Sequence, residues 1–138
     1  MSQKYSIVLV EDSRADIFLV RQALAQSGLD HELHVLEDGG RALSFLRRIG
    51  QDIPHPDVVL MDLNLPKVDG SELIRLLKEH PGCKSVPVIV VTSSDSPKDR
   101  ARTAGLGIRE YFRKPSDLAE FMRLGAVVRS VLESRVEG

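Results

Sequence analysis

The sequence predicts an α/β domain in which helices cover both faces of a parallel sheet. Three observations favour this fold class. Short apolar runs alternate with longer amphipathic stretches, three of the runs are apolar and β-branched at consecutive positions, and the count is five of each kind. Consecutive apolar residues are typical of strands that are buried on both faces. The alternation indicates a doubly wound sheet with right-handed crossovers.

Five short strands are expected. The first, third and fourth carry the strongest apolar runs (YSIVLV, DVVLM and VPVIVV), whereas the second and fifth (ELHVL and IREYF) are weaker. These strands cover residues 5–10, 32–36, 57–61, 86–91 and 108–112.

Capping signals mark two of the five expected helices. Ser13 and Asp16 form a capping pattern at the start of the first helix, and Gly28 stands where that helix would end. Ser96 followed by Pro97 marks the start of the fourth helix, because proline is favoured at the first helical position.

Amphipathic spacing predicts the remaining helices, over residues 38–48, 70–79 and 116–135. The last of these carries several large apolar residues on one face, namely Leu118, Phe121, Met122 and Leu132. A second apolar stripe on this helix contains Leu124, Val127 and Val131. Two stripes are more than one core contact needs, so the second stripe is either a surface for another copy or a wider contact within the domain.

Size and composition fit a single domain over residues 1–138, with no output domain. The chain has 138 residues, of which 42% are hydrophobic and 28% are charged, close to the globular average. A net charge of −1 disfavours a nucleic-acid partner. Cys83 is the only cysteine, which excludes an intramolecular disulfide and suits a reducing cytoplasm. No apolar run approaches the ~20 residues needed to span a membrane, so we expect a soluble cytoplasmic protein with no membrane partner.

Polar side chains follow four of the strands at the edge where α/β sheets bind ligands. Glu11 and Asp12 follow the first strand, Asp62 follows the third, Thr92 follows the fourth, and Lys114 comes just after the fifth. Ligands in such sheets bind beyond the carboxyl ends of the strands. If the first and third strands are neighbours, three carboxylates converge there, with a hydroxyl and an ammonium beside them.

This set of groups suits magnesium-dependent phosphoryl transfer to a carboxylate. Three close carboxylates repel one another, and a hard divalent cation such as Mg²⁺ is their natural counter-charge. Asp62 would attack the phosphorus, Mg²⁺ and Lys114 would neutralise charge on the phosphoryl oxygens, and Thr92 would donate a hydrogen bond.

Four motifs in order resemble the receiver domains of two-component response regulators. They are VLVEDS (8–13), DVVLMDLNLPKVDG (57–70), PVIVVTSS (87–94) and YFRKP (111–115). The resemblance covers about residues 6–134 and implies a CheY-like, flavodoxin-like sheet with strand order 2-1-3-4-5. It also implies a single-domain phosphorelay protein that catalyses only its own phosphorylation and dephosphorylation.

The resemblance assigns roles to individual residues. Asp62 matches the phosphoacceptor and Asp12 the direct Mg²⁺ ligand, while Glu11 assists through water. Asn64 matches the position whose backbone carbonyl binds the metal.

The same resemblance assigns the switching residues. Thr92 matches the hydroxyl that moves to bind the phosphoryl group, and Tyr111 matches the aromatic residue that turns inward with it. Lys114 matches the family's phosphoryl-binding lysine, and its bond to Pro115 is implied to be cis, a form found mainly before proline.

Within this family, the chain is similar to stand-alone regulators that pair with phytochrome-type histidine kinases. The shared features are EDSRADIFLVRQAL (11–24), HELHVLEDG (31–39) and DLNLPKVDG (62–70). The similarity implies a sensor histidine kinase of that type as partner. It also implies a homodimer formed through the fourth helix, fifth strand and fifth helix, the surface that phosphorylation of Asp62 would switch.

Three alternatives differ from this interpretation in function. A phosphatase of the haloacid dehalogenase type also uses an aspartate nucleophile and Mg²⁺, but it places a second aspartate where this chain has Asn64. A flavodoxin-like cofactor module would bring a flavin phosphate against Glu11 and Asp12, which would repel it. A degenerate receiver would act only as a binding module, although such proteins usually lack one of the acidic groups.

Overall fold

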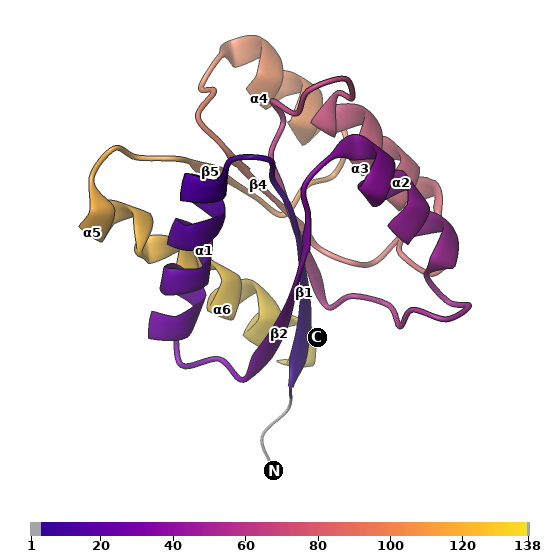
Figure 1. Ribbon diagram of the computed structural model, residues 1–138, viewed down its shortest axis with the longest axis horizontal. Helices are drawn as coiled ribbons and strands as arrows, with labels where there is room; N and C mark the ends of the chain where they lie inside the picture. The colour runs from indigo at the N-terminus through magenta and orange to yellow at the C-terminus, as the bar shows by residue number, and fades with distance from the viewer. Residues whose placement is uncertain (1–3, 138) are drawn as a thin grey trace.

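The computed structural model of the chain confirms the predicted fold class (Figure 1). It describes residues 4–137, with side chains as far as residue 134. Five parallel strands form one sheet in the order β2-β1-β3-β4-β5, as the family resemblance implied. The strands are β1 (Tyr5–Val10), β2 (His31–Leu36), β3 (Val58–Met61), β4 (Val88–Thr92) and β5 (Glu110–Arg113).

Helices cover both faces of this sheet. In Figure 1, α1, α5 and α6 lie on one side and α2, α3 and α4 on the other. Their bounds are α1 (Arg14–Gln26), α2 (Gly39–Arg48), α3 (Gly70–Glu79), α4 (Pro97–Ala104), α5 (Leu118–Phe121) and α6 (Arg123–Glu137). Over residues 4–137, no helix combines the length and the apolarity that a membrane crossing requires.

Alternate residues of the inner strands enter two separate cores. Ile7 and Leu9 of β1 pack into the cluster beneath α1 and α6. Val8 and Val10 point the other way, into the cluster beneath α2 and α3. Successive side chains of a strand face opposite sides of a sheet, so a strand covered on both faces must be apolar at every position. The consecutive apolar runs of the sequence have this origin.

The capping residues act as predicted. The Ser13 hydroxyl accepts a hydrogen bond from the backbone N–H of Asp16 at 3.3 Å and begins α1. The Ser96 hydroxyl accepts one from the N–H of Asp99 at 3.1 Å and begins α4. Each satisfies a backbone donor that a helix start leaves without an intrahelical partner.

Two expectations for the last helix were wrong. The helix is interrupted at Met122, where the N–H of Gly125 donates to the Met122 carbonyl at 3.1 Å and tightens the turn. A Cβ on Gly125 would lie only 2.3 Å from the Ala23 carbonyl oxygen, so glycine allows α6 to approach α1 closely. The four-residue α5 directs Phe121 into the core and leaves Leu118 61% exposed, although both were expected on one buried face.

The second apolar stripe of the last helix faces the inside of the domain. Leu124 and Val131 are buried in the core beneath α1, and Val127 is half-buried against it. Of the two explanations open at the sequence level, the wider contact within the domain is therefore correct. Of the three residues only Val127 is partly exposed, so the stripe offers little surface to a second copy of the chain.

Candidate metal and phosphoryl site

Strand register brings the predicted carboxylates together at the carboxyl edge of the sheet. Val10 of β1 pairs with Met61 of β3, so Glu11 and Asp62 leave the sheet side by side. The N–H of Asp62 donates to the Val10 carbonyl at 3.1 Å, which extends the pairing by one residue. One carboxylate oxygen each from Glu11, Asp12 and Asp62 lies within 4.8 Å of the others. The neighbouring strands therefore produce the cluster that the sequence predicted.

The donor set of this cluster fits a hard divalent cation. All three side chains offer carboxylate oxygens, which Mg²⁺ prefers. Glu11 and Asp62 are buried whereas Asp12 is exposed, so a cation held there would remain open to water and to a phosphoryl oxygen. The N–H of Asn64 donates to Asp62 Oδ1 at 3.2 Å and keeps the Asn64 backbone beside the cluster.

Lys114 lies against the buried side of the cluster. Its N–H donates to the Thr92 carbonyl at 2.8 Å, which continues the pairing of β4 with β5. Its Nζ lies 2.6 Å from Glu11 Oε1, 2.7 Å from Asp16 Oδ2 and 3.4 Å from Asp62 Oδ2. The ammonium is thus the counter-charge of three carboxylates.

The expected cis bond before Pro115 was wrong. No peptide bond within residues 4–137 is cis, so the Lys114–Pro115 bond is trans. The trans form of such bonds is favoured by ~0.5–1 kcal/mol. Lys114 reaches its three carboxylate partners with the trans bond, so these contacts supply no reason for the cis form.

The pKa values of Glu11 and Lys114 reflect this environment. Burial, together with the charge of Asp62, raises the pKa of Glu11 from 4.5 to about 7, although Lys114 opposes the rise. Burial alone would lower the pKa of Lys114, but hydrogen bonds to Asp16 and Glu11 outweigh it, and the pKa is raised. Lys114 therefore stays charged, and Glu11 binds a proton more tightly than an exposed glutamate does.

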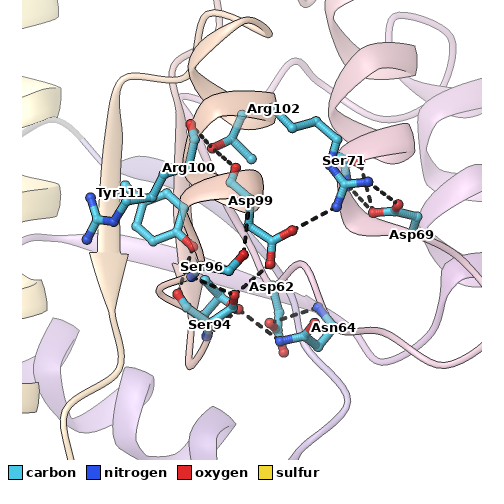
Figure 2. Close-up of polar contacts among 12 residues, drawn as sticks. Asp62, Asn64, Asp69, Ser71, Ser94, Ser96, Asp99, Arg100, Arg102 and Tyr111 are labelled. Carbon is cyan, nitrogen blue, oxygen red and sulfur yellow. Dashed lines mark hydrogen bonds and ion pairs between the residues drawn. The ribbon is translucent and has the colours of Figure 1, made fainter.

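Thr92 ends β4, and Tyr111 lies in the neighbouring strand β5. The buried Thr92 hydroxyl accepts a hydrogen bond from Asn64 Nδ2 at 3.2 Å. The half-buried Tyr111 hydroxyl donates to the Ser94 carbonyl at 2.7 Å. The Arg100 guanidinium carbon lies 4.4 Å from the centroid of the Tyr111 ring, a cation–π contact (Figure 2). The N–H of Ser94 also donates to the Thr92 hydroxyl at 3.4 Å, so both predicted switch residues are bonded to Ser94 in the loop after β4.

A polar network connects this loop with α4 and with the start of α3 (Figure 2). The Ser94 hydroxyl donates to Asp99 Oδ2 at 2.6 Å. Arg102 donates to Asp99 Oδ1 at 2.9 Å and to Asp69 Oδ2 at 3.1 Å. Asp69 also caps α3 by accepting from the N–H of Ser71 at 2.9 Å. The first turn of α4 is therefore tied to both loops beside Asp62.

Close packing holds the loop that carries Asp62 against the start of α3. A Cβ on Gly70 would lie 2.3 Å from the Asp62 carbonyl oxygen and 2.7 Å from the Leu63 Cα. Only glycine permits this approach without moving the backbone.

The sequence-level reasoning missed the role of Asp16. It identified Asp16 only as part of the capping pattern of the first helix. The first turn of a helix that follows a parallel strand lies at the carboxyl edge of the sheet, so its acidic residue was within reach of Lys114.

The hydrogen bonds that Asp99 and Arg102 form with neighbouring loops were also missed. Asp69 and Arg102 are 33 residues apart in the chain, and no spacing rule relates them.

Comparison with known proteins identifies the family. The response regulator receiver domain model matches residues 7–124. Response regulator Rcp1 from Synechocystis sp. is 40% identical over 120 residues, which cover 86% of this chain and 82% of Rcp1. The crystal structure of the phosphorylated cyanobacterial phytochrome response regulator RcpA aligns with a TM-score of 0.86 at 34% identity and covers 96% of each chain. The Mn²⁺-bound form of Rcp1 aligns with a TM-score of 0.82 at 38% identity and covers 91% of this chain and 92% of that chain.

These matches agree with the acidic cluster and its lysine. The cluster is the Mg²⁺ site of a receiver domain, and a histidine kinase is the partner that a receiver implies. Nothing in the comparisons supports the phosphatase alternative. The second residue after Asp62 is Asn64, whose side-chain Nδ2 donates to the Thr92 hydroxyl. The fold, the site and the relatives lead to one family: the chain belongs to the response regulator receiver domains.

Proposed function

We propose that Asp62 accepts a phosphoryl group from the phosphohistidine of a sensor histidine kinase. The observation that carries this proposal is the position of its carboxylate. Asp62 is buried, lies 3.4 Å from the Lys114 ammonium and shares a cluster with two further carboxylates. A carboxylate between a metal site and a fixed ammonium is placed for nucleophilic attack on phosphorus.

The transfer is an in-line displacement. A carboxylate oxygen of Asp62 forms a bond to phosphorus as the bond between phosphorus and the histidine nitrogen breaks, and the imidazole leaves. The Lys114 ammonium neutralises charge on the phosphoryl oxygens. Thr92 accepts its hydrogen bond from Asn64 on the hydroxyl oxygen, so its own proton can turn toward a phosphoryl oxygen.

The metal ligands follow the same assignment. Asp12 and Asp62 would bind Mg²⁺ directly, Glu11 would bind through water, and Asn64 would contribute its backbone carbonyl. Mg²⁺ bound there supplies positive charge at the phosphoryl oxygens.

The output follows from the contacts of Thr92 and Tyr111. Movement of Thr92 toward the phosphoryl group breaks its hydrogen bond with Asn64 and shifts the loop to which Tyr111 is bonded. The same loop is tied to α4 through Ser94 and Asp99. The surface formed by α4, β5 and α6 is therefore the one that phosphorylation changes. The protein acts as a switch and catalyses only its own phosphorylation and dephosphorylation.

The partners extend this proposal. Likeness to Rcp1 and to RcpA, a phytochrome response regulator, supports a phytochrome-type kinase as phosphoryl donor. Arg109 and Glu110, which are consecutive in the chain, are both exposed on the surface of α4, β5 and α6, and opposite charges there suit a two-fold contact between copies of the chain. The buried free thiol of Cys83 fits a reducing cytoplasm.

Intact-mass measurement tests the phosphoacceptor directly. The protein is incubated with acetyl phosphate and Mg²⁺, beside an Asp62→Asn variant. We expect the wild type to gain the mass of one phosphoryl group, and we expect no gain without Mg²⁺ or in the variant. A gain of the same size in Asp62→Asn would assign the phosphoryl group to another residue and overturn the proposal.

A further inference from the structure

The Lys114 ammonium has no donor to spare. An ammonium carries three N–H donors. In the structure they meet three carboxylates, at 2.6 Å from Glu11, 2.7 Å from Asp16 and 3.4 Å from Asp62. To donate to a phosphoryl group on Asp62, Lys114 must give up one of these partners. The identity of that partner sets how readily the lysine engages the phosphoryl group.

Burial decides which bond is broken. The Glu11 side chain is 1% exposed and the Asp16 side chain is 27% exposed. A buried carboxylate that loses its ammonium stays unpaired in a low-dielectric site, which is strongly unfavourable. A partly exposed carboxylate can exchange the same bond for water at much lower cost. Asp62 is the residue that carries the phosphoryl group, so the contact of Lys114 with the Asp62 carboxylate is replaced by a contact with that group.

We propose that Asp16 is a positioning residue, the partner that Lys114 exchanges for the phosphoryl group. This inference rests on the proposed function, in which Asp62 carries that group. Asp16 lies in the first turn of α1, where its N–H is bonded to the Ser13 hydroxyl, so its carboxylate is presented from a fixed backbone. It holds Lys114 between α1 and β5 before transfer and competes with the phosphoryl group during it. Asp16 therefore limits both the rate of phosphorylation and the affinity for a phosphoryl mimic.

An Asp16→Asn variant tests this competition. Two quantities are measured in saturating Mg²⁺: the rate constant of phosphorylation by acetyl phosphate, and the dissociation constant of beryllofluoride by calorimetry. We expect the rate constant to rise and the dissociation constant to fall, each about fivefold, the size expected when a partly exposed ion pair is lost. Asp16→Glu, which keeps the charge, should restore values close to wild type. Asp16→Ser provides a second variant without the carboxylate.

A matched control separates exchange at Lys114 from a general change of charge. Glu37 is exposed, follows β2 at the same edge of the sheet and is not among the three partners of Lys114. Glu37→Gln removes one negative charge from this edge, as Asp16→Asn does. We expect it to leave both quantities within about twofold of wild type, since exposed charges are well screened.

The outcomes are distinguishable. Equal gains in Glu37→Gln and Asp16→Asn would show that only the local charge matters and would overturn the exchange. Unchanged or weaker beryllofluoride binding in Asp16→Asn would also overturn it. A wild type that never takes up phosphate contradicts the proposed function, yet the beryllofluoride measurement still reports whether Asp16 competes for Lys114.

Discussion

Two halves of the carboxyl edge of the sheet are held together by different forces. The half above β1 and β3, called here the charged half, contains Glu11, Asp62 and Lys114, which are almost fully buried. The half above β4, called here the α4 half, depends on polar contacts among Ser94, Asp99 and Arg102, which are half-buried or exposed. Removing one member of a buried pair leaves an uncompensated charge, whereas exposed pairs contribute little. The chemical groups are therefore fixed more firmly than the helix beside them.

The helices beside the site show the same contrast. In α3, five residues are buried, including Leu73, Ile74 and Leu77. In α4, only Thr103 is buried. An amphipathic helix is held mainly by its apolar face, and α4 has almost none. This difference fits a mechanism in which the charged half carries out the phosphoryl transfer, while α4 changes position with a small loss of free energy.

Replacing Lys114 should produce the largest effect. Lys114→Met removes the ammonium that faces Glu11 and Asp62 and leaves both carboxylates buried without it. We expect the free energy of unfolding, measured with urea at neutral pH without Mg²⁺, to fall by about 3 kcal/mol. Adding Mg²⁺ should recover more stability in the variant than in wild type, because the cation then becomes the main counter-charge of the cluster.

A second lysine serves as the control for that change. Lys78 is half-buried and donates to the Val86 carbonyl at 3.3 Å, and burial lowers its pKa. Lys78→Met removes a lysine that is less buried than Lys114 and faces no carboxylate cluster, so we expect a loss below about 1 kcal/mol. Equal losses in the two variants would show that the charged half is not held by its buried charges.

The protonation of Glu11 should give the next largest effect. Its pKa is 4.5 in an ordinary environment and about 7 in the folded protein, so the native state binds the proton more tightly. This contribution to stability is complete below pH 4.5 and is lost as the pH rises through about 7. Without Mg²⁺, the free energy of unfolding of wild type should fall by about 2 kcal/mol between about pH 5 and pH 7, relative to Glu11→Gln.

Urea denaturation of both proteins at several pH values provides this measurement. Carboxyl groups whose pKa is lowered, such as Asp99, change the free energy of unfolding below about pH 4 and not between about pH 5 and pH 7. Parallel curves for wild type and Glu11→Gln would show that Glu11 is ionised in the metal-free protein. The charged half would then be held by the lysine alone.

The same contrast explains what could be predicted from the sequence. The apolar runs of β1, β3 and β4 are buried on both faces, and this burial determines their composition, so their positions were readily predicted. The acidic cluster followed from strand ends, because register transfers a one-dimensional pattern to one edge of the sheet. The charged half was therefore largely predictable, apart from Asp16.

The α4 half and the last helix were harder to predict. The contact between Arg102 and Asp69 joins two exposed side chains from separate loops and helices, and such pairs have no sequence periodicity. The break at Met122 depends on the close approach of Gly125 to Ala23 of α1, a tertiary contact that local helical spacing does not encode. The stripe through Leu124 was visible, but the sequence left open what would cover it.

Replacing Arg102 should give the smallest change in the free energy of unfolding, with a local increase of amide hydrogen exchange in α4. Arg102 joins Asp99 of α4 to Asp69 at the start of α3, and its side chain is 42% exposed. For Arg102→Ala we expect a loss of only about 0.5 kcal/mol, with backbone amides of α4 exchanging hydrogen about two- to threefold faster. Arg75→Ala is the control, because the ion-pair partners of Arg75 within the described residues are glutamates of its own helix, α3, which the core holds. If Arg75→Ala accelerated hydrogen exchange in α3 as much as Arg102→Ala does in α4, the contrast between the two helices would be contradicted. Burial of α3 would then not protect its amides better than those of α4.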